Sequence, residues 1–326
     1  MKRFLVTGAT GFLGGHLVER LLAKQDVTVR ILCRGANRWT AMPRVEVVYG
    51  DILDVAVVER ASREAEGIFH LAGFVTRDRS RAAELFDIHV RGTKNLCESA
   101  LRNGSPPIVL TSSSGTIAAS RVPAMHNEDS PFTNEIAGRW PYYLSKVYQE
   151  KLALSFHENH NLPVIIVSPS LLLGPGDERI SSTGDVLLFL RRKMTNVPTG
   201  GLNFVDVRDT AGALVRAMDS GIPGRRYLIG GHNMTLKEFF LLLERLSGVT
   251  GPRLELPETW SRGGAAVLRT LYKVVGREFP LDDVTVEMAY RFWYFDNSRA
   301  RSELGLNPRP AEETLRDTIA WLRERR

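Results

Sequence analysis

A tyrosine and a lysine four residues apart are the side chains of this sequence best suited to proton transfer. They are Tyr142 and Lys146, in the segment YYLSK. On a helix, positions i and i+4 share one face, so the ammonium group would stabilise a tyrosine phenolate. Lowering a tyrosine pKa by about three units takes roughly 4 kcal/mol, whereas an exposed ion pair supplies about 1 kcal/mol. The pair can therefore act as acid and base only inside a dry cleft.

A run of serines precedes this pair. Ser113 lies in the segment TSSSGT, where an expected strand ends. A hydroxyl group there can hydrogen-bond a substrate oxygen and orient it toward Tyr142. In the alternative interpretation, the tyrosine and lysine are a chance surface pair and the serines cap a turn.

A glycine-rich segment, TGATGFLG at 7–14, follows an apolar run and precedes a helical pattern. A phosphate can approach the N–H groups of a helix N-terminus only where no Cβ intrudes, and the helix dipole then favours the anion. Gly8 and Gly11 would allow that approach, and Gly14 would let helix and strand pack closely. The spacing is one residue wider than the GxGxxG fingerprint, so taken alone it also fits an ordinary turn. In its context, the segment predicts a site for a dinucleotide pyrophosphate.

The first half of the chain alternates between strand and helix patterns. Strands are expected at Phe4–Val6, Val27–Leu32, Val45–Tyr49, Ile68–Leu71, Ile108–Leu110 and Val164–Val167. Helices are expected at Leu13–Ala23, Val55–Arg63, Arg81–Arg102 and Tyr142–Asn159. This alternation predicts an α/β fold, a Rossmann-type doubly wound parallel sheet with helices on both faces.

The regular alternation fails from about residue 171. Short strands are expected at Asn203–Val207 and Arg226–Ile229, and helical patterns follow them. We expect residues 1–169, with about 202–232, to form the cofactor domain, and residues 170–201 plus 233–326 to form a smaller, mainly helical substrate lobe. The apolar segments 265–275 and 290–295 would fill the core, roof an apolar pocket or touch a membrane surface. The crevice between the two lobes is the expected ligand site.

Composition excludes several classes of protein. The 326 residues are 43% hydrophobic and 25% charged, and a net charge of +6 is scattered along the chain. Because no basic stripe is interleaved with aromatic residues, we expect no nucleic-acid partner. Two cysteines indicate no disulfide framework and favour a reducing cytoplasm. We expect no signal peptide, no membrane-spanning segment and no metal site.

Six motifs occur in a fixed order. They are TGATGFLG, GDI at 50–52, HLAG at 70–73, TSSSGT, YYLSK and SPSLLLGPGD at 168–177. Together they resemble the extended short-chain dehydrogenase/reductase family, a resemblance that continues through NFVDVRD at 203–209 to the C-terminal helix. The resemblance implies a Rossmann-type cofactor domain, a smaller substrate domain and a catalytic set of Ser113, Tyr142 and Lys146. Ser112 is the alternative serine, because alignment within a serine triplet is uncertain by one position.

The resemblance also implies a set of cofactor-binding residues. These are Gly8, Gly11, Phe12 and Leu13 for the pyrophosphate, Asp51 and Ile52 for the adenine, Leu71 and Ala72 for the adjoining ribose and phosphate, Tyr142 and Lys146 for the nicotinamide ribose, and Pro169 and Leu171 for the nicotinamide. One residue departs from the family pattern. His89 replaces the asparagine of the family's NVxGT motif. It is expected to be a packed histidine, with a substitute proton relay as the alternative.

The end of the second expected strand bears on cofactor choice. Enzymes that use NAD commonly carry an acid there for the ribose hydroxyls, whereas this strand ends in Arg34, and Asp26 comes too early. A guanidinium group suits a phosphate through bidentate hydrogen bonds. Arg34, with Arg38 as a second contact, therefore favours NADP(H), and NAD(H) stays open.

Side-chain chemistry narrows the reaction class. Sugar dehydratases place an Asp-Glu pair beside the catalytic hydroxyl residue, whereas Ser113 is followed by Ser114-Gly115-Thr116. The motif style is similar to that of dihydroflavonol reductases and their bacterial relatives. We therefore expect a reductase or dehydrogenase acting on a small to mid-sized, largely apolar carbonyl compound. A nucleotide-sugar epimerase and a cofactor-sensing binding protein are the alternatives, and a homodimer stays open.

Overall fold

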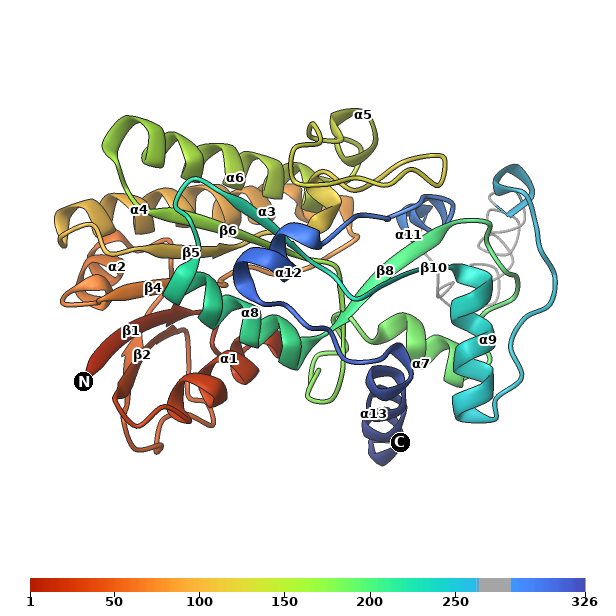
Figure 1. Cartoon of the computed structure of the whole chain (residues 1–326), viewed down its shortest axis with the longest axis horizontal. Helices are drawn as coiled ribbons and strands as arrows, with labels where there is room; N and C mark the ends of the chain where they lie inside the picture. Colours follow the sequence, from red (N-terminus) through yellow and green to blue (C-terminus); the bar gives the residue numbers. More distant parts are fainter. Residues whose placement is uncertain (262, 264–282, 326) are drawn as a thin grey trace.

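A seven-stranded, fully parallel sheet organises the larger lobe of the computed structural model, which describes residues 1–261, 263 and 283–325 (Figure 1). The strand order is β3-β2-β1-β4-β5-β6-β9. The strands are β1 (Lys2–Thr7), β2 (Val27–Cys33), β3 (Val45–Tyr49), β4 (Gly67–His70), β5 (Ile108–Thr111), β6 (Val164–Pro169) and β9 (Arg226–Ile229). The order reverses direction between β1 and β4, where doubly wound sheets bind their ligands.

Helices cover both faces of this sheet. One face carries α1 (Phe12–Leu22) and α8 (Val207–Ser220), and the other carries α2 (Val55–Ser62), α4 (Gly92–Arg102) and α6 (Pro141–His160) (Figure 1). Strands β4 and β6 are buried along their whole length. Near-continuous apolar runs are typical of strands buried on both sides, so these strands can be predicted from the sequence.

The smaller lobe contains a second sheet in the order β10-β8-β7, with β7 (Leu171–Leu173), β8 (Gly201–Asp206) and β10 (His232–Thr235). Its described helices are α7 (Gly184–Leu190), α9 (Leu236–Ser247), α11 (Asp283–Ala289) and α13 (Ala311–Glu324), whereas α12 (Ser298–Leu304) packs through Ala300 and Leu304 into the core of the large lobe. Phe189, Phe204 and Phe239 meet in a separate hydrophobic core. The segment 202–232 is divided between the lobes, because β8 pairs within the small sheet while β9 joins the large one. No helix within the described ranges is long and apolar enough to cross a membrane.

The expected helix at Arg81–Arg102 is wrong as a single element. The segment forms a 3-10 turn η1 (Arg79–Arg81), a short helix α3 (Ala82–Phe86) and a π-helical turn η2 (Asp87–Arg91) before α4 begins. A π turn inserts an extra residue into the helix and changes the direction of the side chains around it. Here it contains His89, which is fully buried.

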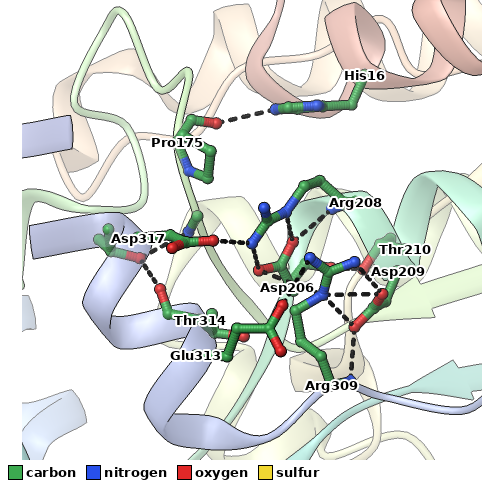
Figure 2. A network of polar contacts seen from close by, with 12 residues as sticks. His16, Pro175, Asp206, Arg208, Asp209, Thr210, Arg309, Glu313, Thr314 and Asp317 are labelled. Carbon is green, nitrogen blue, oxygen red and sulfur yellow. Dashed lines mark hydrogen bonds and ion pairs between the residues drawn. The ribbon is translucent and has the colours of Figure 1, made fainter. Parts of the chain in front are cut away.

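A buried carboxylate connects the two lobes (Figure 2). Asp206 ends β8, and its Oδ1 accepts hydrogen bonds of 2.8 Å from both the backbone N–H and Nε of Arg208 at the start of α8. Arg208 also donates to Asp317 in α13 (2.6 Å), and Arg309 pairs with Asp209 (2.9 Å). Burial alone would raise the pKa of Asp206, but its arginine partners outweigh burial and hold that pKa below its ordinary value. The C-terminal helix is thereby fixed to the junction between the two sheets.

The glycine turn allows two unusually close backbone contacts. Gly8 has φ +76°, and a Cβ there would lie 2.5 Å from the carbonyl oxygen of Leu71 at the end of β4. A Cβ at Gly14 would lie 2.1 Å from the carbonyl oxygen of Gly8. Helix α1 can therefore pack onto the turn only because position 14 lacks a side chain.

Two neighbouring glycines of α1 provide a matched test of this packing. Gly14→Ala should lower the free energy of unfolding by about 1–3 kcal/mol, since the added methyl group meets backbone that cannot move aside. Gly15→Ala should be neutral or stabilising, because its Cβ meets only the mobile end of Arg38, and alanine favours helix. Urea unfolding of both variants measures the difference. Equal stabilities for the two variants would contradict the close packing.

Candidate active site

A cavity of about 1990 Å³ lies between the two lobes and exceeds the roughly 300–1,000 Å³ of a typical ligand pocket. It has room for a dinucleotide and a second molecule together. All residues expected from the sequence to be catalytic or cofactor-binding line it: Gly8, Gly11, Phe12, Leu13, Arg34, Asp51, Ile52, Leu71, Ala72, Ser113, Tyr142, Lys146, Pro169 and Leu171. The structure thus brings together residues that are far apart in the sequence.

The glycine turn forms the end of the cavity where the sequence predicts a pyrophosphate. Gly11 is the N-cap of α1 and provides no capping side chain, so the N–H groups of the first helical turn have no side-chain acceptor there. A Cβ at Gly11 would meet only the carbonyl oxygen of Gly8, at 3.3 Å. The turn therefore leaves open backbone donors at the positive end of a helix dipole, an arrangement that fits a pyrophosphate.

The adenosine end carries the two arginines that follow β2. The side chain of Arg34 is 72% exposed, and its Nη1 lies 3.9 Å from Oδ2 of Asp51. The guanidinium group of Arg38 stacks 4.3 Å from the ring centroid of Trp39, and its Nη2 lies 3.1 Å from Oε1 of Glu19. Both arginines face the cavity, and Arg34 has the freer guanidinium group of the two.

Trp39 is a residue of this region that the sequence analysis missed. It is buried, and its Nε1–H donates to the carbonyl oxygen of Ala9 (3.1 Å). This bond ties the loop after β2 to the glycine turn and so places both arginines beside it. A lone tryptophan between polar residues carries no periodic signal, but a buried indole N–H requires an acceptor.

The serines of the triplet have different hydrogen-bond partners in the structure. Ser112 is buried, and its Oγ donates to Glu150, which also accepts from Thr116 (2.8 Å) and pairs with Arg226 (2.7 Å). Ser113 Oγ instead accepts from the backbone N–H of Gly115 (3.4 Å), which caps a 3-10 turn as in the alternative interpretation, and its hydroxyl group also lies close enough to Tyr142 to lower the pKa of that tyrosine. The geometry therefore places Ser113, and not Ser112, beside the tyrosine.

Tyr142 lies at the start of α6 with its side chain in the cavity wall. Burial raises its pKa to about 12, and the hydrogen bond with Ser113 opposes that rise. This differs from the lowered tyrosine pKa expected from the sequence, because the loss of water around the phenol dominates. The hydroxyl group is consequently protonated at neutral pH and available as a proton donor.

Lys146 lies one helical turn further along α6 and is buried. Its Nζ donates to the carbonyl oxygen of Thr111 at the end of β5 (3.0 Å) and to Oε1 of Gln149 (2.9 Å). Burial lowers the pKa of Lys146 to about 8, although the negative charge of Glu150 acts to raise it. A cation held by neutral acceptors thus lies beside the tyrosine, and Gln149 is a partner that the sequence analysis missed.

His89 packs beneath the tyrosine. Its ring meets that of Tyr142 edge-on, with centroids 5.8 Å apart. Ser145 Oγ donates to the carbonyl oxygen of Tyr142 (2.7 Å), so His89 Nδ1 donates to Ser145 Oγ (2.8 Å). Burial, followed by the charge of Lys146, lowers the pKa of His89 well below its ordinary value. The histidine is neutral and packed, and it supports the backbone that carries the tyrosine.

The substrate side of the cavity has an aromatic wall. Tyr143 stacks on Trp293 with centroids 5.2 Å apart, and Trp140 lies 5.6 Å from the same indole ring. An ion pair lies nearby, in which Arg77 Nη2 is 3.1 Å from Oδ2 of Asp185. Of the apolar segments singled out in the sequence, 290–293 contributes to this wall, whereas 265–275 lies outside the described residues.

Comparison with known proteins agrees with this architecture. The chain is 35% identical to "Sterol demethylase protein B" from Methylococcus capsulatus, with 98% of each chain covered. It is 31% identical to "Putative dihydroflavonol 4-reductase" from Synechocystis, covering 98% of this chain and 94% of the relative. A solved double mutant of DesIV, a dTDP-glucose 4,6-dehydratase from Streptomyces venezuelae with NAD bound, superposes with a TM-score of 0.76 at 25% identity, covering 99% of this chain and 97% of that one. Residues 4–230 match the model of the NAD dependent epimerase/dehydratase family, and the chain belongs to that family.

Proposed function

We propose that this protein is an NADP(H)-dependent oxidoreductase that reduces the carbonyl group of a largely apolar substrate or oxidises the corresponding alcohol. The observation that carries this proposal is that Ser113, Tyr142 and buried Lys146 line one cavity together with the glycine turn, with the tyrosine and the lysine one turn apart on the same helix. The names of the two curated relatives, one a reductase and one tied to sterols, support an apolar substrate.

Residues of the large lobe would hold the cofactor. The open N–H groups at the start of α1 would receive the pyrophosphate, Asp51 and Ile52 would contact the adenine, and Arg34 would pair with the additional phosphate that distinguishes NADP(H). Bound there, the nicotinamide supplies or accepts the hydride. Its ring would lie near Pro169, at the carboxyl end of β6, which borders the same cavity as the tyrosine.

The protein's own contribution is to hold and move one proton. Tyr142 Oη donates its proton to the carbonyl oxygen of the substrate during reduction and takes it back during oxidation. The Ser113 hydroxyl orients that oxygen through a second hydrogen bond. Lys146 keeps a positive charge beside the phenolate that forms, and its burial makes this charge effective because little water screens it.

Substrate preference follows from the side chains that both lobes contribute to the cavity wall. Tyr143 and Trp293 present stacked aromatic faces next to the catalytic tyrosine, and the pairing of Arg77 with Asp185 removes net charge from this region. A flat, uncharged carbonyl compound gains from burial against such a wall, whereas a diphosphate would require uncompensated cations. This distinguishes the proposed substrate from a nucleotide sugar.

The first test separates a reductase from an epimerase. Incubation of the protein with NADPH and a panel of apolar ketones should consume NADPH in proportion to the alcohol formed. An epimerase would instead retain its cofactor through purification, isomerise UDP-sugars and consume no NADPH. Cofactor binding without turnover of either substrate class would indicate a cofactor-sensing protein.

Substitution of the proton donor tests the mechanism. Tyr142→Phe should abolish turnover while leaving the Kd for NADPH nearly unchanged, since only a hydroxyl group is lost. Tyr143→Phe is the matched control, because it removes the adjacent buried hydroxyl and should retain activity. Steady-state kinetics and cofactor titration measure both effects. A Tyr142→Phe enzyme with the wild-type rate on its substrate would refute the assigned role.

Substitution of the phosphate-binding arginine tests cofactor choice. Arg34→Ala should weaken NADP(H) binding by roughly 1.5–3 kcal/mol, the range for charge-assisted hydrogen bonds, and leave NAD(H) binding nearly unchanged. Selectivity would fall by about one to two orders of magnitude. Calorimetric titration of wild type, Arg34→Ala and Arg38→Ala with both cofactors provides the measurement. A wild-type preference for NAD(H), or a larger loss in Arg38→Ala, would overturn the role of Arg34.

A further inference from the structure

A continuous chain of buried hydrogen bonds leads away from the catalytic lysine. Lys146 Nζ donates to Gln149 Oε1 (2.9 Å), and Gln149 Nε2 donates to Thr93 Oγ1 (2.8 Å). Thr93 Oγ1 lies 2.9 Å from His70 Nε2, and His70 Nδ1 lies 2.7 Å from Thr7 Oγ1. All five side chains are at least nine-tenths buried. They connect α6 to the end of β1 through α4 and β4.

The direction of each bond in this chain is determined at Thr93. Its hydroxyl group donates its one hydrogen to the carbonyl oxygen of His89 (2.5 Å). Thr93 Oγ1 must therefore accept from both Gln149 Nε2 and His70 Nε2. Because the amide nitrogen of Gln149 is held at Thr93, its oxygen is turned toward the ammonium group of Lys146. The glutamine cannot rotate without losing both contacts.

The other end of the chain lies at the glycine turn. With its proton on Nε2, His70 accepts at Nδ1 from the hydroxyl group of Thr7, which in turn accepts from the backbone N–H of Ala72 (3.1 Å). Burial, followed by the charge of Lys146, lowers the pKa of His70 to about 3, so the ring remains neutral at physiological pH. Thr7 directly precedes Gly8, the first glycine of the pyrophosphate turn.

We propose that Gln149, Thr93, His70 and Thr7 are positioning residues. They hold the Lys146 ammonium group at a fixed position relative to the glycine turn at 7–14. The proposal rests on the proposed function, in which Lys146 acts beside the catalytic tyrosine. It assigns a role to the buried polar side chains that separate the lysine from the turn. Gln149 supplies the acceptor for the ammonium group, and Thr93 fixes the orientation of the Gln149 amide. His70 hydrogen-bonds both Thr93 and Thr7, and so links the amide to the strand that carries the turn.

The charges around Lys146 explain why a neutral acceptor matters. Among the described residues, the titratable groups that interact with its charge are Glu150 from α6, His70 from β4 and His89 from the π turn, and Tyr142 lies one helical turn before it on α6. Both histidines are neutral, the phenol is protonated, and Glu150 is already bonded to Arg226. The orientation of the ammonium group therefore depends on its two direct acceptors, Thr111 and Gln149, while Glu150 favours its charged form.

A matched pair of variants at Thr93, where the chain of hydrogen bonds branches, tests the proposal. Thr93→Val has nearly the same shape but removes the acceptor, so kcat for carbonyl reduction should fall about 10- to 100-fold, the effect of small misplacements in active sites. The Kd for NADPH should change little. The alkaline limb of the pH profile should move to lower pH, since a Gln149 amide released from Thr93 no longer holds its oxygen toward Lys146, and the lysine then gives up its proton more easily. Thr93→Ser keeps the hydroxyl group and should restore both the rate and the profile.

A second pair of variants, at Gln149, should shift the alkaline limb of the pH profile in opposite directions. Gln149→Leu should move the alkaline limb to lower pH, and Gln149→Glu, of nearly equal shape, should move it to higher pH because a carboxylate favours the ammonium form. A merely structural role would alter melting temperature without these opposed shifts. Unmoved limbs in folded Thr93→Val and Gln149→Glu proteins would overturn the proposal.

A spectroscopic measurement is independent of catalysis. Nitrogen-15 NMR of histidine-labelled protein should show His70 as the neutral Nε2–H tautomer in wild type, and Thr93→Val should disturb that signal. A different tautomer in wild type would overturn the hydrogen-bond directions even if the enzyme is a reductase. If instead Tyr142→Phe keeps full activity while the His70 signal is as expected, the proposed function fails and the chain of bonds stands.

Discussion

The relative placement of the two lobes depends on one buried carboxylate. Asp206 ends a strand of the small sheet, caps the helix that packs under the large sheet and holds the arginine that reaches the C-terminal helix. Removing one partner of such a buried ion pair leaves an uncompensated charge, which typically costs about 3–5 kcal/mol. The network therefore fixes strand β8, helix α8 and helix α13 to one another at the junction of the two sheets.

The reactive groups collect at one edge of the large sheet for a geometric reason. Parallel strands all end at the same edge, so Thr7, Thr111 and Pro169 at the ends of β1, β5 and β6 border one region. A lysine buried in this region requires acceptors, and a carbonyl oxygen at a strand end can supply one without adding charge. A neutral environment keeps the ammonium group responsive to charge that develops on the neighbouring phenol. The fold thereby holds the lysine with one backbone carbonyl group and one neutral amide side chain.

The large sheet and most of the site could be predicted from the sequence because their signals are local. Strands buried on both faces are continuous apolar runs, and glycines 8, 11 and 14 and the spacing of Tyr142 and Lys146 lie within single elements. Contacts between distant segments could not be predicted. Ser112 and Ser113 differ only because Glu150, 38 residues away from Ser112, binds one of them. Strands β7 and β10 are short and owe their existence to pairing with β8, and the π turn at His89 leaves the helical periodicity around it nearly intact.

One contact between the lobes has a consequence for the lifetime of any complex. His16 of α1 donates from Nε2 to the carbonyl oxygen of Pro175 (2.9 Å), in the loop that follows β7 (Figure 2). This contact brings a loop of the small lobe against the helix that begins at the pyrophosphate turn, and both lie along the same cavity. A ligand that occupies the turn would therefore be partly enclosed by protein from both lobes. Its release would then require the His16–Pro175 contact to open, so the residence time of such a ligand would reflect loop opening as well as affinity.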